Sequence, residues 1–220
     1  MNNEYNNSFR SPDISRETFE REDLMKQKYV YFDTETGGVD PKTSALLSLA
    51  MIYECGDVRE ELCVYIRPGL GKECNPIALQ VNGFTTEEIE NSDRFISQRK
   101  AYEKIIAWLG PKINKFDRKD KAWLVGYNSQ AFDTPFLVEF FREMNDQYFF
   151  SWFWSDNLDV RVLAASALRE SRRSMKNFKL MTVAKHLNLE VDESQAHDAL
   201  YDVKITREVF KALTAQAIQV

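Results

Sequence analysis

The order of the apolar runs differs between the two halves of the chain. In the first half, Tyr29–Phe32, Ser44–Glu54 and Glu61–Arg67 are predicted as successive strands, the last two joined as an antiparallel hairpin. In the second half, the strand-like run Ala122–Tyr127 is followed by amphipathic helical patterns. This order favours one α/β domain with a mixed central sheet, in which three antiparallel strands are joined by parallel βα units and flanked by helices.

The helices expected from the sequence lie mostly in the second half. The capping box Thr85–Glu88 opens a short helix. Longer helices are predicted over Phe95–Leu109, from Pro135 onward, and over Val160–Arg169, Phe178–Asn188 and Asp198–Thr214. Residues 1–27, rich in Asn, Ser, Arg and Glu, are predicted as a polar N-terminal tail with a short helix, and residues 28–220 as one domain.

Composition excludes several classes of protein. The chain has 220 residues, 44% of them hydrophobic, which suits one globular domain with a sizeable core. No uncharged stretch approaches the ~18 residues of a membrane span, and the opening MNNEYNNSFR lacks the apolar region of a secretory signal. The three cysteines form no CxxC pair, so we expect reduced thiols, a cytoplasmic protein and no membrane partner.

The net charge of −5 restricts the kind of nucleic-acid contact. An acidic protein is unsuited to coating duplex DNA, because such coating depends on neutralising many phosphates. It can still grip a single strand end, above all when metal cations lie among its carboxylates.

Paired carboxylates mark the end of the first predicted strand. Asp33 and Glu35 are two residues apart, so their side chains leave the same face of the strand. Two like charges that close repel each other unless a cation or a proton compensates. The pair is therefore either a metal site or a solvated strand end.

Two further acidic residues could complete such a site. Asp133 precedes Pro135 and is either a metal ligand or a helix N-cap. Asp202 follows His197 by five residues, while the second histidine, His186, lies within a helical pattern and is interpreted as structural. Carboxylates from separate elements can hold two divalent ions for phosphodiester hydrolysis, and a histidine that titrates near neutrality can take the proton of the attacking water. The residues alone indicate a two-metal phosphodiesterase and leave its substrate open.

Three strings, in order along the chain, resemble the motifs of a known family. They are FDTETG at residues 32–37, NSQAFD at 128–133 and HDALYD at 197–202. They are similar to the three motifs of the DEDDh 3′→5′ exonucleases, whose fold is ribonuclease H-like. Stretches such as SALLSLA at 44–50 and PIALQVNGF at 76–84 resemble ribonuclease T, which belongs to this family together with polymerase proofreading subunits. The resemblance covers residues 28–213.

The resemblance implies a role for each matching position. The metal ligands that it implies, for two Mg²⁺ or Mn²⁺ ions, are Asp33, Glu35, Asp133 and Asp202. It implies that His197 is the general base, that Glu35 is also catalytic, and that Thr34 and Asn128 contact the terminal nucleotide.

One position departs from the family pattern. Gly38-Val39 stands where many relatives carry a bulky apolar or aromatic residue, so the base-stacking set of ribonuclease T is not expected to be intact.

Aromatic residues near these motifs suit contacts with unpaired bases. Phe84 and Phe132 are interpreted as substrate-binding, because stacking on an aromatic ring tolerates any base. The aromatic run Tyr148–Trp154 is interpreted as packing, in a core or an interface. The five basic residues between Arg169 and Lys179 could bind phosphates, although a solvated helix end is the more common meaning of such a run.

The function predicted from the sequence is that of a metal-dependent 3′→5′ exonuclease. It would release nucleoside 5′-monophosphates from the 3′ ends of single-stranded nucleic acid, with DNA favoured over RNA. Two alternatives stay open: an exoribonuclease like ribonuclease T or oligoribonuclease, and a non-catalytic nucleic-acid-binding member of the fold. The last is disfavoured because no carboxylate or histidine of the motifs is missing. A homodimer and a polymerase or repair partner also stay open.

Overall fold

A six-stranded mixed sheet forms the centre of the molecule, with the strand order β4-β3-β2-β1-β5-β6. The computed structural model describes residues 27–217, so the predicted tail and its short helix lie outside the described residues apart from Gln27. The strands are β1 (Tyr29–Thr36), β2 (Leu46–Cys55), β3 (Val58–Ile66), β4 (Phe95–Ile96), β5 (Trp123–Gly126) and β6 (Leu158–Asp159). β1, β2 and β3 pair antiparallel, and the other pairings are parallel. The predicted mixed α/β architecture is confirmed.

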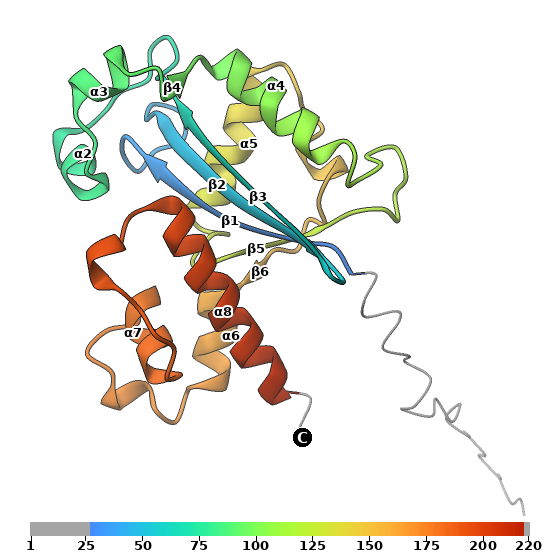
Figure 1. Ribbon diagram of the computed structural model, residues 1–220, viewed down its shortest axis with the longest axis vertical. Helices are drawn as coiled ribbons and strands as arrows, with labels where there is room; N and C mark the ends of the chain where they lie inside the picture. The colour runs from blue at the N-terminus through green and yellow to red at the C-terminus, as the bar shows by residue number, and fades with distance from the viewer. Residues whose placement is uncertain (1–26, 218–220) are drawn as a thin grey trace, which may run out of the picture.

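Helices cover both faces of this sheet. They are α2 (Pro76–Asn82), α3 (Thr86–Asn91), α4 (Gln98–Leu109), α5 (Asp133–Glu143), α6 (Val160–Ala167), α7 (Leu180–His186) and α8 (Ala199–Ala217). Figure 1 shows α6, α7 and α8 together on one side of the sheet and α4 and α5 on the other. Within residues 27–217, no helix combines the length and the apolarity needed to span a bilayer.

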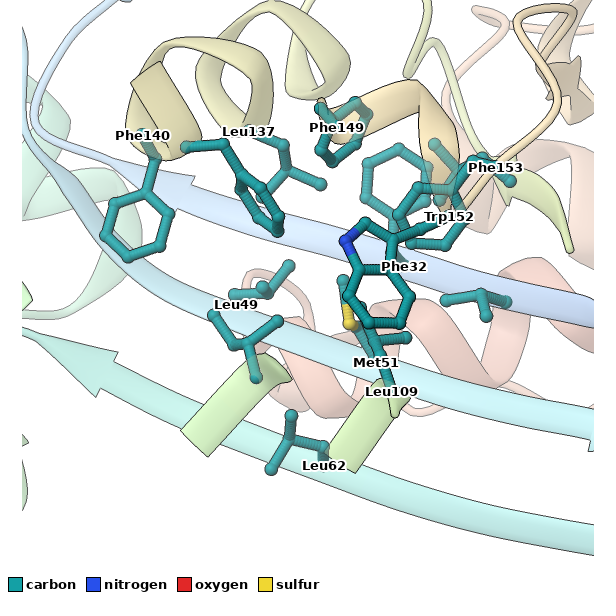
Figure 2. Close-up of a cluster of buried hydrophobic side chains, with 14 of the residues drawn as sticks. Phe32, Leu49, Met51, Leu62, Leu109, Leu137, Phe140, Phe149, Trp152 and Phe153 are labelled. Atoms are coloured by element: carbon teal, nitrogen blue, oxygen red, sulfur yellow. The ribbon is translucent and has the colours of Figure 1, made fainter. Parts of the chain in front are cut away.

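Successive side chains of β1 lie on alternate faces of the sheet, and this alternation separates Asp33 and Glu35 from Thr34. Val30 and Phe32 are buried in the cluster that packs under α4 and α5, and Figure 2 shows Phe32 among the rings and aliphatic chains of that cluster. Tyr31 is buried on the opposite face, against α8. Successive side chains of a strand point to opposite faces. Asp33 and Glu35 therefore share the α8 face with Tyr31, whereas Thr34 shares the α5 face with Phe32.

Several predicted boundaries differ from the structure. The helix expected from Phe95 begins only after its N-cap Ser97, because Phe95 and Ile96 pair with β3 as the short strand β4. β6 and α2 were not predicted. The local signals for α2 are nonetheless present, since Asn75 caps its start and Gly83, at φ 70°, ends it in the left-handed region. The hairpin of β2 and β3 and the capping box at Thr85 are confirmed.

The aromatic run of residues 148–154 packs mainly into the core, as predicted. Phe149, Trp152 and Phe153 are at most 3% exposed. The ring of Phe149 lies 4.9 Å from that of Phe141 on α5, which joins the run to the helix layer. Tyr148 and Phe150 are the exceptions, with exposed fractions of 73% and 38%.

Candidate active site

An open hollow of about 320 Å³ lies beside the C-terminal half of β1. It is lined by side chains from β1, from the segment between β5 and α5, from α2, and from the segment that leads into α8. Of the nine predicted site residues, all but Phe84 line it: Asp33, Thr34, Glu35, Asn128, Phe132, Asp133, His197 and Asp202. The fold thus brings together residues that are as much as 169 positions apart in the sequence, from Asp33 to Asp202.

The β1 carboxylates meet the start of α8. Glu35 is only 7% exposed, and Asp33 opens onto the hollow from the same face of the strand. Asp202 lies in the first turn of α8, which packs on β1. The three carboxylates therefore approach one another because a strand face and a helix terminus are packed together.

Asp133 reaches the site from the other face of the sheet, through Thr34. Its Oδ1 accepts hydrogen bonds from the backbone N of Thr34 at 3.1 Å and from Thr34 Oγ1 at 2.5 Å. The alternative interpretation of Asp133 as a helix N-cap is wrong: Phe132 occupies the cap position, without a side-chain cap bond, and Asp133 is the first residue of α5. The hydroxyl of Thr34, a predicted substrate-binding residue, is thus hydrogen-bonded to Asp133.

His197 and Asp202 are joined through the backbone. The backbone N of His197 donates to Asp202 Oδ2 at 3.3 Å, and the exposed histidine side chain faces the hollow. His197 has φ 69°, a left-handed conformation that costs free energy in a non-glycine residue. The other oxygen of Asp202, Oδ1, is buried and has no hydrogen-bond partner among the described residues.

Burial and mutual repulsion oppose ionisation of these carboxylates. Loss of hydration, followed by the charges of Asp133 and Glu35, raises the pKa of Asp33 well above its ordinary value. Burial, followed by the charge of Asp202, raises the pKa of Glu35 to about 8. Burial also raises the pKa values of Asp133 and Asp202 to about 6, although the hydrogen bonds from Thr34 and from the His197 backbone act against it. At neutral pH these shifts oppose the ionisation of Asp33 and Glu35 most strongly, whereas Asp133 and Asp202, with pKa values of about 6, stay largely ionised.

The donor set fits divalent cations in its chemistry. Carboxylate oxygens are the ligands that Mg²⁺ and Mn²⁺ prefer, the charges repel one another without a cation, and Asp202 Oδ1 is buried with no partner. Across residues 27–217, however, no three His, Cys, Asp or Glu side chains already stand in an arrangement that could hold an ion. The four carboxylates share one hollow, and ion binding would have to draw them together.

The rim of the hollow is apolar and was largely missed by sequence reasoning. Val39 is 83% exposed and Val81 is 51% exposed, and both line the hollow together with Phe132. The ring of Phe132 also packs on Phe136 of α5, 5.4 Å away. The N-cap and C-cap signals of α2 could have placed Val81 on a helix, but not beside Asp33.

Phe84 lies apart from the carboxylates. It lines a second hollow of about 300 Å³, which adjoins the first through Val81, Asn82 and His197. Its ring packs edge-on against Tyr65 and Phe95. Phe84 thus lines the neighbouring hollow, and its predicted contact with substrate stays a prediction.

Comparison with known proteins identifies the family. Residues 30–210 match the exonuclease family RNase_T. The chain belongs to this family, the DEDDh 3′→5′ exonucleases. The chain therefore carries the family's three motifs on the elements described above, with their acidic residues and the histidine facing one hollow.

Relatives in sequence agree with this assignment, and solved structures share the fold. Ribonuclease T of Histophilus somni is 29% identical over 203 residues, which cover 85% of each chain. The PolC-type DNA polymerase III of Mycoplasmopsis pulmonis is 26% identical over 85% of this exonuclease, which spans only 11% of the polymerase. A zinc-bound complex of Escherichia coli exonuclease I with single-stranded DNA superposes with a TM-score of 0.70 and 21% identity, over 87% of this chain and 41% of exonuclease I. The structural likeness confirms the ribonuclease H-like fold.

Proposed function

We propose that this exonuclease removes nucleoside 5′-monophosphates from the 3′ ends of single-stranded nucleic acid by two-metal-ion hydrolysis, with DNA favoured over RNA. The observation that carries the proposal is the hollow in which Asp33, Glu35, Asp133 and Asp202 face one another beside His197. Their raised pKa values reflect burial and mutual repulsion, which bound cations would relieve. The matched residues 30–210 also support the proposal that residues 28–220 form one exonuclease domain.

Divalent ions held by the four carboxylates would activate the attacking water and stabilise the departing 3′-oxygen. His197 accepts the proton of that water in this proposal, because it is exposed to the hollow and lies directly before the helix that carries Asp202. Thr34 orients Asp133 through two hydrogen bonds to one oxygen, which leaves the second oxygen available for an ion.

The rim of the hollow supports an unpaired substrate. Val39 and Val81 expose aliphatic surface beside the ring of Phe132, and such surface can contact a base only when that base is free of its partner. Aliphatic contacts also distinguish little between bases, so we expect weak sequence preference. Complexes of Escherichia coli exonuclease I with single-stranded oligonucleotides, which share this fold, are consistent with a DNA substrate.

A second candidate is an exoribonuclease like ribonuclease T. It is favoured by the ribonuclease T relatives, which align over most of both chains, whereas the exonuclease spans less than half of exonuclease I. The two candidates share the carboxylates and the histidine, so they differ in contacts to the 2′-hydroxyl.

Side-by-side digestion separates these candidates. Single-stranded DNA, single-stranded RNA and blunt duplex DNA of one sequence, each labelled at the 5′ end, are incubated with the protein in Mg²⁺ and in EDTA. Mg²⁺-dependent shortening from the 3′ end, fastest on single-stranded DNA, supports the proposal. Faster digestion of RNA would favour the second candidate. Activity in EDTA, or cleavage of a circular strand, would contradict the metal-dependent exonuclease.

A further inference from the structure

A buried carboxylate ties the edge of the hollow to α6. Asp159, at the end of β6, is 7% exposed. Its Oδ1 accepts hydrogen bonds from the backbone N of Asn128 and of Arg161, each at 3.0 Å, and its Oδ2 accepts one from the backbone N of Gln130 at 3.3 Å. One side chain therefore fixes the loop after β5 against the first turn of α6, so the positions of residues 128 and 161 are set relative to each other.

The side chains of these two residues are bonded as well. Arg161 Nη1 donates to Asn128 Oδ1 at 2.7 Å, across 33 positions of sequence. A guanidinium group has donors only, so the amide oxygen of Asn128 must face Arg161. Asn128 lines the hollow, and the amide NH₂ group is the part of its side chain that this bond leaves available.

The backbone of Asn128 is held in a costly conformation. Its φ is 63°, in the left-handed region that is uncommon for residues other than glycine. Such conformations persist where the surroundings over-determine them, often at functional sites. Here the bond that the Asn128 backbone N donates to Asp159 holds the backbone, and the bond that Arg161 donates to Asn128 Oδ1 holds the side chain.

We propose that Arg161 is a positioning residue for the substrate: it orients the Asn128 amide so that the NH₂ group donates to an oxygen of the terminal nucleotide. The inference rests on the exonuclease function proposed above and deepens it. The group recognised is a hydrogen-bond acceptor, such as a sugar or phosphate oxygen. Since Arg161 is exposed and positively charged, the competing explanation is that it binds a backbone phosphate directly.

A double-mutant cycle distinguishes these two explanations. Asn128→Gly removes the side chain and tolerates a positive φ, and Arg161→Ala removes the guanidinium. The dissociation constant of 5′-fluorescein-labelled deca-thymidylate is measured by fluorescence anisotropy in EDTA, and kcat and KM are measured in Mg²⁺. If Arg161 acts through Asn128, each single variant weakens binding by about 3–10-fold, the usual worth of one hydrogen bond, and the double variant binds no more weakly than Asn128→Gly alone.

Further variants make the cycle specific. Arg161→Lys keeps one donor and should recover part of the lost affinity. Arg142→Ala, which removes an exposed positive charge at the far end of α5, controls for net charge and should leave the dissociation constant unchanged. Melting curves check that each variant is folded.

Salt dependence supplies an independent readout. A direct phosphate contact contributes about −0.7 to the slope of log affinity against log salt concentration for a single strand. The proposal predicts an unchanged slope for Arg161→Ala, and it is overturned by a shallower slope or by additive losses in the double variant. If the wild-type protein binds the oligonucleotide without digesting it, the proposed function fails, while the binding cycle still decides the role of Arg161.

Discussion

Neutralising one carboxylate of the candidate site should stabilise the metal-free protein while it abolishes turnover. Burial and the charge of Asp202 raise the pKa of Glu35 from 4.5 to about 8. The folded state therefore binds the Glu35 proton more tightly than the unfolded state does. By linkage, this group lowers the free energy of unfolding as the pH rises from about 4.5 to about 8. Glu35→Gln removes that penalty.

The magnitude follows from the size of the shift. The interval from 4.5 to about 8, at about 1.36 kcal/mol for each pH unit, sets an upper limit of about 5 kcal/mol at pH 8. Repulsion is shared among the carboxylates, and a buried amide keeps part of the desolvation cost. We therefore expect a gain of about 1–3 kcal/mol, and a domain of this size gains roughly 2–4 °C in Tm for each kcal/mol.

Thermal melting in EDTA at pH 5 and at pH 8 measures this effect. At pH 8 the Tm of Glu35→Gln should exceed that of the wild type by several degrees, and at pH 5, where Glu35 is already protonated, the difference should shrink. Mg²⁺ added at pH 8 should raise the Tm of the wild type more than that of the variant. Glu103→Gln, at an exposed position on α4, controls for net charge. A destabilised Glu35→Gln at pH 8, or an equal gain at both pH values, would refute the reasoning.

Three other predictions concern single positions. His197→Ala should lower kcat by about 10²–10⁴-fold and leave the Mg²⁺-induced rise in Tm intact; loss of that rise would make His197 a metal ligand. Thr34→Val removes a hydrogen bond that lowers the pKa of Asp133, so the acidic limb of the kcat/KM profile should move to higher pH, and an unmoved limb would show that Asp133 does not govern it. Phe149→Ala should cost about 3–5 kcal/mol in urea unfolding because its ring is buried in the core, whereas the exposed Tyr148→Ala should change stability by less than about 0.5 kcal/mol; similar losses would contradict the packing shown in Figure 2.

Local patterns in the sequence were sufficient to predict the mixed α/β architecture, and the three motif strings singled out eight of the residues that line the hollow. Alternation along Tyr29–Thr36 predicts a buried strand that presents Asp33 and Glu35 on one face, and the structure agrees. The hairpin and the helix at Thr85 also follow from short-range signals, the turn and the cap. Such features depend on residues only a few positions apart, so the sequence carries them directly.

Contacts between distant segments were decided only by the tertiary structure. The hydrogen bond between the Thr34 hydroxyl and Asp133 was not predicted, and it forms because the odd and even residues of β1 face different helices. Phe84 was predicted to bind substrate; α2 and its cap place it at the adjoining hollow, and its contact with substrate stays a prediction. The bond between Arg161 and Asn128 exists because β6 pairs with β5 and so places the first turn of α6 beside the loop after β5. The periodicity of apolar residues predicts which face of a strand or helix a side chain lies on. Which distant side chain it contacts there depends on how the strands and helices pack, and only the tertiary structure shows that.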